Sequence, residues 1–359
     1  MMPLIKTISE TILKAGVAKV QDLGKTRFLD VIGGRDGGHS ARFGDRSVWV
    51  FGDTFLSSAG QDGSNWRSST WCWTQDFDAR DGIGSLDEPV DAKGAPEEFL
   101  PFTRGELLYN KIHYLQFLPE RLRSRWALWP GPVVVSPQGD KAYVFYAKVL
   151  ARPGPLNFQS VGSSIALWEA PDKPVVRPKV RPGENDPTIL FPKGDVTLGQ
   201  GALVVDDWLY AYGCESGELS WPCIVARVRF SDALKRDAWE FFAGEDRWSK
   251  DWTEAVTVMD AAPALSVHWN EYLGKYLAVY SNQLANTISI RTADRPEGPW
   301  SDNHVVVDCF APSNSKIWSY SGMAHPEFSR DNGRVEYLTY YRETGSFKGE
   351  IRLIEVSFR

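Results

Sequence analysis

The hydrophobic pattern of the chain is a series of short apolar and aromatic runs separated by Gly, Pro, Asp and Asn, which is typical of an all-β protein. Five times a turn-like pair opens such a run, and a second short run lies just before the turn. The five longer runs are GDRSVWVFGD from Gly44, GDKAYVFYAK from Gly139, DDWLYAYGCE from Asp206, LGKYLAVYSN from Leu273 and NGRVEYLTYY from Asn332. The runs that precede them are SARF, GPVVVSP, GALVVD, PALSVHW and HPEFSR. Each pair of runs predicts a β-hairpin closed by a tight turn.

Further apolar runs follow the hairpins and give each unit three or four strands. They are SSIALWEA, CIVARVRF, TISIRTA and EIRLIEVSF. Five small antiparallel sheets of this kind fit a radial arrangement, which limits exposed strand edges by repetition, so we predict an all-β, five-bladed β-propeller. A two-sheet sandwich is the alternative, but it explains five equivalent hairpins less well. Long helices are not evident.

The spacing of the units sets the predicted domain boundaries. Successive units start about 60 to 95 residues apart, and the surplus in the first unit predicts an insertion at about 57–125. In this interpretation residues 31–359 form a single propeller domain. Residues 1–30 form an N-terminal lead-in.

Charge and composition exclude several classes of partner. The formal net charge is -6 and no basic stripe is present, which argues against a nucleic-acid partner. No run reaches the roughly 18 apolar residues of a membrane span, so we expect no membrane partner. The start of the chain lacks the long apolar core of a secretory signal, which leaves a cytoplasmic protein or a trimmed secreted one. The sequence leaves the oligomeric state open.

The four cysteines show no CxxC or CxxH spacing, so we predict no zinc site. They are Cys72, Cys214, Cys223 and Cys309. Cys214 and Cys223 could face each other across a hairpin and form a disulfide. Four buried free thiols are the preferred interpretation.

Two aspartates in the first hairpin are the main candidates for chemistry. Asp36 lies nine residues before the turn at Asp45, and Asp53 lies eight residues after it. The start of one hairpin strand and the end of the other lie at the same end, so both carboxylates should reach the same face of one blade. Both are surrounded by glycines and apolar residues, where an acid is costly to bury unless it is paired or hydrogen-bonded.

The same count in the other hairpins finds a polar residue eight or nine positions after each turn. These residues are Lys148, Glu215, Asn282 and Arg342. His325 falls near the place in the fifth unit that Asp36 holds in the first. Together they predict a polar pocket at one end of the propeller axis, with Glu215 as a third catalytic acid and the others as substrate contacts. The ordinary alternative is that they are solvated strand ends and that His325 is a structural histidine.

Aromatic residues are abundant, with 15 Trp, 13 Tyr and 18 Phe, and flat rings stack on sugars as well as in cores. Trp129 is a candidate for substrate binding on this basis. Trp66, Trp71 and Trp73 in the predicted insertion would form a stacking wall over the pocket, or else pack against the outside of blade one.

Paired carboxyl groups are the requirement of glycoside hydrolysis, in which one donates a proton to the leaving oxygen and the other acts as base or nucleophile. Asp36 and Asp53 meet that requirement. The chain has no Gly-rich phosphate loop, GxSxG elbow, HExxH or dinucleotide motif. The alternatives are a non-catalytic carbohydrate-binding propeller, and a propeller phosphorylase or lyase that would use Lys148, Arg342 and His325.

The stretch GGRDGGHSARFGDRSVWVFGDTFL resembles the opening of the DUF4185/DUF5005-like five-bladed propellers, which carry a DGG aspartate and a Trp-x-Phe-Gly-Asp-Thr strand. RTADRPEGPWS looks like a blade-four segment that these families share with arabinanase-like glycosidases. SGMAHPEF and EIRLIEV are similar to their last blade. The resemblance extends from about Val31 to the C-terminus and is weakest in the insertion.

This resemblance implies a propeller glycosidase acting on furanosides or related sugars, and some DUF4185 members are endo-acting D-arabinanases. The DGG aspartate maps to Asp36 and the FGDT aspartate to Asp53. Glu215 has no confident match to the general-acid glutamate of the arabinanase-like families. Some of those propellers hold an axial calcium ion near a histidine, a role that His325 or His39 could fill here, although nothing in the sequence requires a cofactor.

Overall fold

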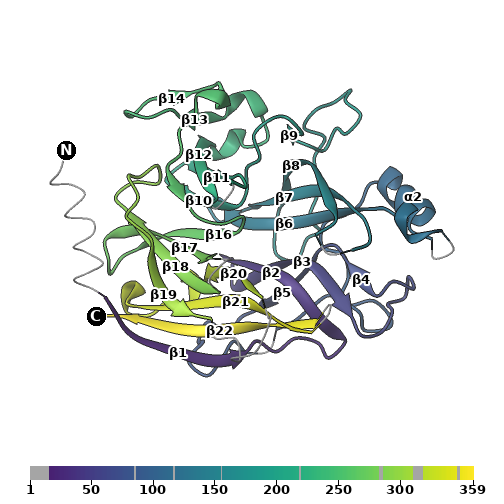
Figure 1. Cartoon of the computed structure of the whole chain (residues 1–359), viewed down its shortest axis with the longest axis horizontal. Coiled ribbons are helices and arrows are strands. Elements are labelled where there is room, and N and C mark those ends of the chain that lie inside the picture. The colour runs from purple at the N-terminus through teal and green to yellow at the C-terminus, as the bar shows by residue number, and fades with distance from the viewer. Residues whose placement is uncertain are drawn as a thin grey trace.

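A computed structural model describes residues 16–84, 86–115, 118–154, 156–217, 220–282, 286–309, 318–345 and 348–359. The strands form five separate sheets arranged around a common axis, which confirms the predicted five-bladed β-propeller (Figure 1). Of the predicted N-terminal lead-in, residues 1–15 lie outside the described residues.

Blades one to three follow in chain order. Blade one contains β2 (Ile32–Phe43), β3 (Arg46–Leu56), β4 (Trp66–Arg67) and β5 (Thr70–Thr74). Blade two contains β6 (Arg125–Val135), β7 (Ala142–Ala151), β8 (Phe158–Trp168) and β9 (Phe191–Pro192). Blade three contains β10 (Gly201–Val205), β11 (Trp208–Cys214), β12 (Pro222–Arg229), β13 (Glu240–Phe242), β14 (Trp248–Ser249) and β15 (Met259–Asp260).

The last two blades complete the circle. Blade four contains β16 (Leu265–Asn270), β17 (Lys275–Asn282), β18 (Thr287–Ala293) and β19 (His304–Asp308). Blade five contains β20 (Ser319–Ala324), β21 (Val335–Gly345), β22 (Lys348–Phe358) and β1 (Val17–Lys25). The described helices are α2 (Arg104–His113) and the short 3₁₀ turns η1 (Glu120–Leu122), η2 (Phe230–Asp232), η3 (Arg236–Ala238), η4 (Trp252–Glu254), η5 (Pro326–Phe328) and η6 (Asp331–Gly333).

The first strand of each hairpin lines the axis. β2 contacts β6 and β20, β10 contacts β6 and β16, and β16 contacts β20, so these five strands form a closed ring. Each blade packs on the next through its own hydrophobic cluster. Trp49 and Tyr337 belong to the cluster between blades one and five, and Phe145 and Trp239 to the one between blades two and three. The large aromatic content is therefore mostly core between blades.

The ring is closed by the N-terminal strand. β1 pairs antiparallel with β22 and forms the outer strand of blade five, with Val17 opposite Phe358 (Figure 1). Residues 17–25 fall in the predicted lead-in, but they form a strand of the propeller. The pairing joins two segments that are far apart in the sequence, so no pattern within residues 1–30 shows it.

Blade one and blade five differ from the predicted boundaries in two further places. The segment predicted as an insertion contributes β4 and β5, both of which pair with β3. HPEFSR, predicted as a strand, instead contains η5, and β20 takes the place of that strand earlier in the chain. Pro326 explains the difference, because its fixed φ and missing N–H suit the first turn of a helix and not a central strand.

The preferred interpretation of the cysteines is wrong for two of them. Cys214 and Cys223 form a disulfide, and they lie directly opposite each other on β11 and β12. Cys72 and Cys309 are buried free thiols. The hairpin register decides the pairing, which is why the spacing alone left both outcomes open.

None of the helices within the described residues has the length and apolar character needed to cross a membrane.

Candidate active site

Asp36 and Asp53 face each other across an irregular stretch of the β2–β3 hairpin. Arg35 is opposite Thr54 and Gly37 is opposite Phe51, which leaves Asp36 opposite both Gly52 and Asp53 in a β-bulge. Gly37 has a φ of 91°, a conformation that L side chains rarely adopt. The hairpin thus brings the two acids together, as their spacing from the turn predicts.

Asp53 is held by two indole groups. The Nε1 atoms of Trp66 and Trp129 both donate to its Oδ1, at 3.1 and 2.9 Å. An indole nitrogen can only donate, so this oxygen acts as an acceptor. Trp66 comes from β4 and Trp129 from the inner strand of blade two.

A half-buried cation lies beside these two indole groups. The guanidinium of Arg125 lies 3.3 Å from the ring centroid of Trp66 and 4.4 Å from that of Tyr114. Its positive charge acts on Asp53 and lowers the pKa of that carboxyl. The sequence analysis does not single out this arginine for the site.

Asp36 has a partner from the far end of the chain. The hydroxyl of Tyr320 on β20 donates to Oδ1 of Asp36. The ring of Tyr320 packs against Trp318 and Tyr341, each with centroids 4.7 Å apart. Blade five therefore contributes the group that orients an acid of blade one.

Both carboxyls are partly buried, and both have raised pKa values. Burial, with a further contribution from the charge of Asp53, raises the pKa of Asp36 to about 7 despite the hydrogen bond from Tyr320. Burial raises the pKa of Asp53 to about 6, against the opposing effects of Trp129, Arg125 and Trp66. Two neighbouring carboxyls with pKa values raised toward neutrality are an arrangement suited to acid–base catalysis.

A third carboxyl lies in the segment after blade one's hairpin. Glu98 accepts hydrogen bonds from the backbone and hydroxyl groups of Ser68 and Ser69, and burial raises its pKa to about 7. Its contacts anchor the turn between β4 and β5. The same turn fixes Trp66, so Glu98 supports the wall of the site.

Glu215, the predicted third catalytic acid, lies apart from this pair. It is exposed and follows Cys214 at the end of β11, where its backbone N–H donates to the carbonyl of Pro222. The charges that bear on the two aspartates come from each other and from Arg125. The structure does not bring Glu215 into the cluster.

Three of the predicted substrate contacts lie in other surroundings. Lys148 is buried, with its Nζ 2.5 Å from both Glu106 and Asp186. Arg342 forms an ion pair with Glu350. Asn282 ends β17 and is half-buried.

Of the three tryptophans of the predicted stacking wall, Trp66 lies at the two acids, as does the separate candidate Trp129, whereas the other two do not. Trp66 and Trp129 touch Asp53, and the ring of Trp129 also packs edge-on against Phe158. Trp71 and Trp73 instead pack with each other in the cluster between blades one and two. Alternation along β5 and the register with β3 decide this, and neither is visible as a motif.

The implied axial calcium ion can be compared with the two histidines named for it. His325 does not fit: its Nδ1 meets Ser40 Oγ at 2.6 Å, its Nε2 meets Thr339 Oγ1 at 2.7 Å, and its ring stacks on Trp49. His39 lines an axial cavity of about 760 Å³, and burial lowers its pKa to about 4. Over the described ranges, no three His, Cys, Asp or Glu residues gather as a metal site. The calcium ion stays a prediction, with His39 as its remaining candidate.

Comparison with known proteins gives a family and a set of folds. The sequence model of the family described as "Domain of unknown function (DUF4185)" matches residues 25–342. A solved β-xylosidase, RS223, is similar at 14% sequence identity, with a TM-score of 0.50 and 94% of each chain covered. Zg3597, a family 117 glycoside hydrolase produced by the marine bacterium Zobellia galactanivorans, is similar at 12% identity and a TM-score of 0.51, over 94% of this chain and 90% of that one. A search of curated proteins gives no match. These two neighbours in fold are glycoside hydrolases by name, and at these identities the likeness is one of fold alone.

Proposed function

We propose, from the premise that the chain belongs to the DUF4185 family, that it is a glycoside hydrolase with Asp36 and Asp53 as its catalytic pair. The observation that carries the proposal is the pair itself. Two carboxyls share one β-bulge, their hydrogen-bond partners are uncharged, and both pKa values are raised. A protein that only binds sugar needs no such pair.

The surroundings divide the roles. Asp53 receives two indole N–H groups and the positive charge of Arg125, which favour its carboxylate form. Asp36 lies beside that negative charge, so it keeps its proton to higher pH. We therefore assign Asp36 as the proton donor and Asp53 as the base or nucleophile.

The reaction follows from these roles. Asp36 donates its proton to the glycosidic oxygen as the bond to the anomeric carbon breaks, which releases the leaving sugar as an alcohol. Asp53 either attacks the anomeric carbon or removes a proton from the water that does so. In both cases one water molecule is consumed, and Asp36 is protonated again at the end of the cycle.

The substrate class rests on the resemblance and on the aromatic walls. Trp129 and Tyr320 are half-buried rings beside the two acids, and flat rings suit the faces of a sugar. The two structural neighbours act on glycosides by their names, a β-xylosidase and a family 117 glycoside hydrolase. Furanosides and related polysaccharides or oligosaccharides are the first substrates to test.

The test is a hydrolysis screen of the full chain on aryl furanosides, arabinans, arabinogalactan and aryl pyranosides, with and without phosphate and EDTA. We expect phosphate-independent sugar release on at least one substrate, and loss of that release in Asp36→Asn and Asp53→Asn. Release that requires phosphate would indicate a phosphorylase. Binding to a glycan without cleavage would overturn the proposal in favour of a carbohydrate-binding protein.

A further inference from the structure

Helix α2 has its amphipathic character reversed. Its outer surface carries Leu107, Leu108 and Ile112, which are 54%, 59% and 49% exposed. Its inner surface carries Glu106, which is buried, and Tyr109 and Asn110, which are half-buried. A surface helix normally turns its apolar residues to the core. The opposite orientation of α2 therefore needs a structural explanation, and it leaves an apolar surface exposed to solvent.

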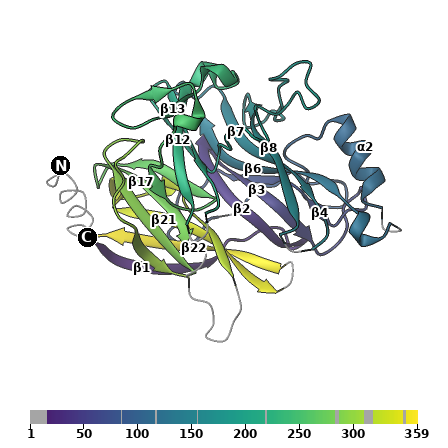
Figure 2. The same ribbon diagram turned by 45° about the horizontal axis from the view of Figure 1, so that its top comes forward.

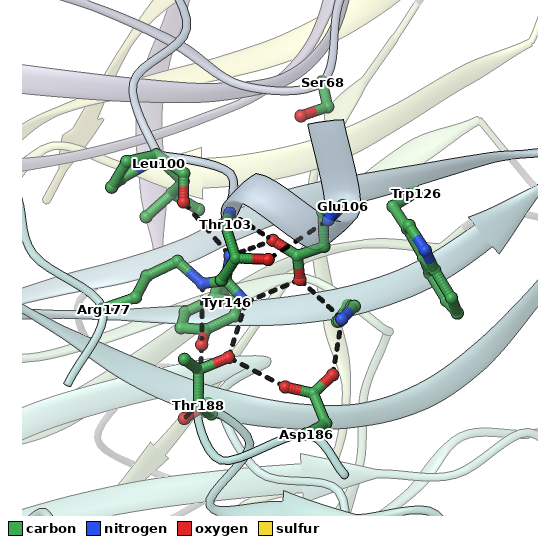
Figure 3. A network of polar contacts seen from close by, with 12 residues as sticks. Ser68, Leu100, Thr103, Glu106, Trp126, Tyr146, Arg177, Asp186 and Thr188 are labelled. Carbon is green, nitrogen blue, oxygen red and sulfur yellow. Dashed lines mark hydrogen bonds and ion pairs between the residues drawn. The ribbon is translucent and has the colours of Figure 1, made fainter. Parts of the chain in front are cut away.

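The cause is a polar network that fixes the helix from inside. Thr103 and Glu106 form a capping box at its N-terminus. The carboxylate of Glu106 is also bonded by Arg177, at 2.7 and 3.1 Å, and lies 2.5 Å from Nζ of Lys148. Figure 3 shows Arg177 and Glu106 directed toward one another, with Thr188 and Asp186 completing the network.

Further inward contacts of the helix are polar as well. The hydroxyl of Tyr109 lies 2.8 Å from that of Ser124. Asn110 bonds the backbone of Trp126 in both directions, at 3.1 and 2.6 Å. Rotating the helix to bury its leucines would break all of these bonds, so the exposed apolar face is fixed by the fold.

The outer face is also basic. At 3.6 residues per turn, Arg104 and Lys111 fall on the same side as the three apolar residues, and both are exposed. The one acid in the helix, Glu106, points inward and is neutralised there. A chain with a net charge of -6 therefore presents a local positive, apolar surface.

We propose that this face of α2, made of Arg104, Leu107, Leu108, Lys111 and Ile112, docks the protein on the surface of an anionic lipid membrane. Apolar side chains flanked by basic ones are the combination that binds at the boundary of headgroups and acyl chains. A second copy of the chain fits less well, because a symmetric contact would bring Arg104 and Lys111 close to their own copies. One ten-residue helix also offers far less area than a stable dimer needs.

The placement of the helix suits such a role. In both views α2 lies at the periphery of the propeller, on the opposite side from the C-terminal end of β22 (Figure 2). Tyr114, the residue after α2, stacks on Arg125, which stacks on Trp66 beside Asp53. The C-terminal end of α2 therefore adjoins the wall of the candidate site. The proposal itself does not depend on hydrolysis.

The test is co-sedimentation of the full chain with vesicles of phosphatidylcholine alone or of equimolar phosphatidylcholine and phosphatidylglycerol. We expect binding to the anionic vesicles that weakens with salt and is at least about tenfold weaker on neutral ones. Leu107→Ser, Leu108→Ser and Ile112→Ser combined, or Arg104→Glu with Lys111→Glu, should each lower binding by about tenfold or more. All variants should keep the thermal midpoint and the activity on a soluble substrate, because these side chains face solvent.

The matched control replaces three exposed apolar residues elsewhere, with Val90→Ser, Val256→Ser and Val305→Ser combined. It should bind anionic vesicles like the unmodified chain. Three results would overturn the proposal: no binding to anionic vesicles at low salt, equal loss in the control variant, or a dimer in light scattering that the triple α2 variant abolishes.

Discussion

Two groups of carboxyls with little exposure to solvent occur in this propeller, and their pKa values shift in opposite directions. Glu106 meets Arg177 and Lys148, and although burial acts to raise its pKa, these two cations lower it to about 2. Asp36 and Asp53 meet hydroxyl and indole groups instead, and their pKa values rise to about 7 and 6.

The pKa values differ because only Glu106 has cations in direct contact. Burial acts to raise the pKa of all three acids, but ion pairs with two cations keep the carboxyl of Glu106 ionised, so that it holds the structure together. Neutral hydrogen-bond donors leave Asp36 and Asp53 able to gain and lose a proton near neutral pH. Burial of an acid therefore does not by itself mark a site in this fold: Glu106 is fixed by its ion pairs and Glu98 by two serines. Asp36 and Asp53 stand out because two such acids share one β-bulge.

The largest expected effect tests whether the two aspartates are catalytic, by replacing each of them with its uncharged amide. Asp36→Asn or Asp53→Asn should lower the hydrolysis rate by about 10²–10⁴-fold, since each removes one partner of the acid–base pair. Steady-state kinetics on the substrate found in the screen measures this loss. A variant of either residue that keeps full activity would contradict the assigned roles.

The same two variants should become more stable, not less. A folded pKa above the unfolded value means that stability is complete below about pH 4 and falls as pH rises through 6 to 7. Replacing Asp36 by Asn removes that loss, so the free energy of unfolding at pH 8 should rise by on the order of 1 kcal/mol. Denaturant unfolding at pH 8 and pH 4 checks this, and the gain should disappear at pH 4.

Glu106→Gln should have the opposite effect. It leaves two buried cations short of a partner, which costs about 3 kcal/mol of unfolding free energy. A folded pKa below the unfolded one gives stability that is present above about pH 4.5 and lost as pH falls through 2, and the variant should lack this slope. Thr103→Ala, which removes only the cap, should cost about 1 kcal/mol and serves as the control. Equal loss of unfolding free energy in both variants would contradict the proposal that the ion pairs of Glu106 contribute more stability than its helix cap.

A smaller effect, on the pH dependence of the rate, is expected from removing the positive charge of Arg125 beside Asp53. Arg125→Met removes the cation that lowers the pKa of Asp53, so the acid limb of the pH–rate profile should shift upward by about half a pH unit to one unit. Arg125→Lys keeps the charge and should shift it less. Measurement of kcat/KM from pH 4 to 9 checks both variants, and an unchanged acid limb in Arg125→Met would contradict the role of that charge.

Much of the fold follows from local sequence. The hairpin of blade one could be predicted from turn residues and alternating runs, and its spacing correctly brings Asp36 and Asp53 together. Tyr320 could not be predicted, because it reaches Asp36 from 284 residues away through the closure of the ring. Only the folded ring makes these residues neighbours.

Other differences have the same kind of cause. The pairing of Cys214 with Cys223 depends on the register of two strands, which the sequence leaves open. The orientation of α2 depends on Arg177 and Lys148, which lie in another blade and neutralise Glu106. A helical pattern with leucines would normally predict the reverse orientation, with no docking face. The expectation of no membrane partner rests on the absence of an apolar run long enough to span a membrane, which does not test for a helix that docks on its surface.

The pairing of β1 with β22 has a consequence for biosynthesis. β1 is synthesised before the other described strands of the propeller, and its partner β22 is synthesised after them. Until β22 emerges, β1 has an open edge and blade five lacks one strand. That edge is available to any other extended segment during this interval, so its protection depends on how quickly the propeller is completed.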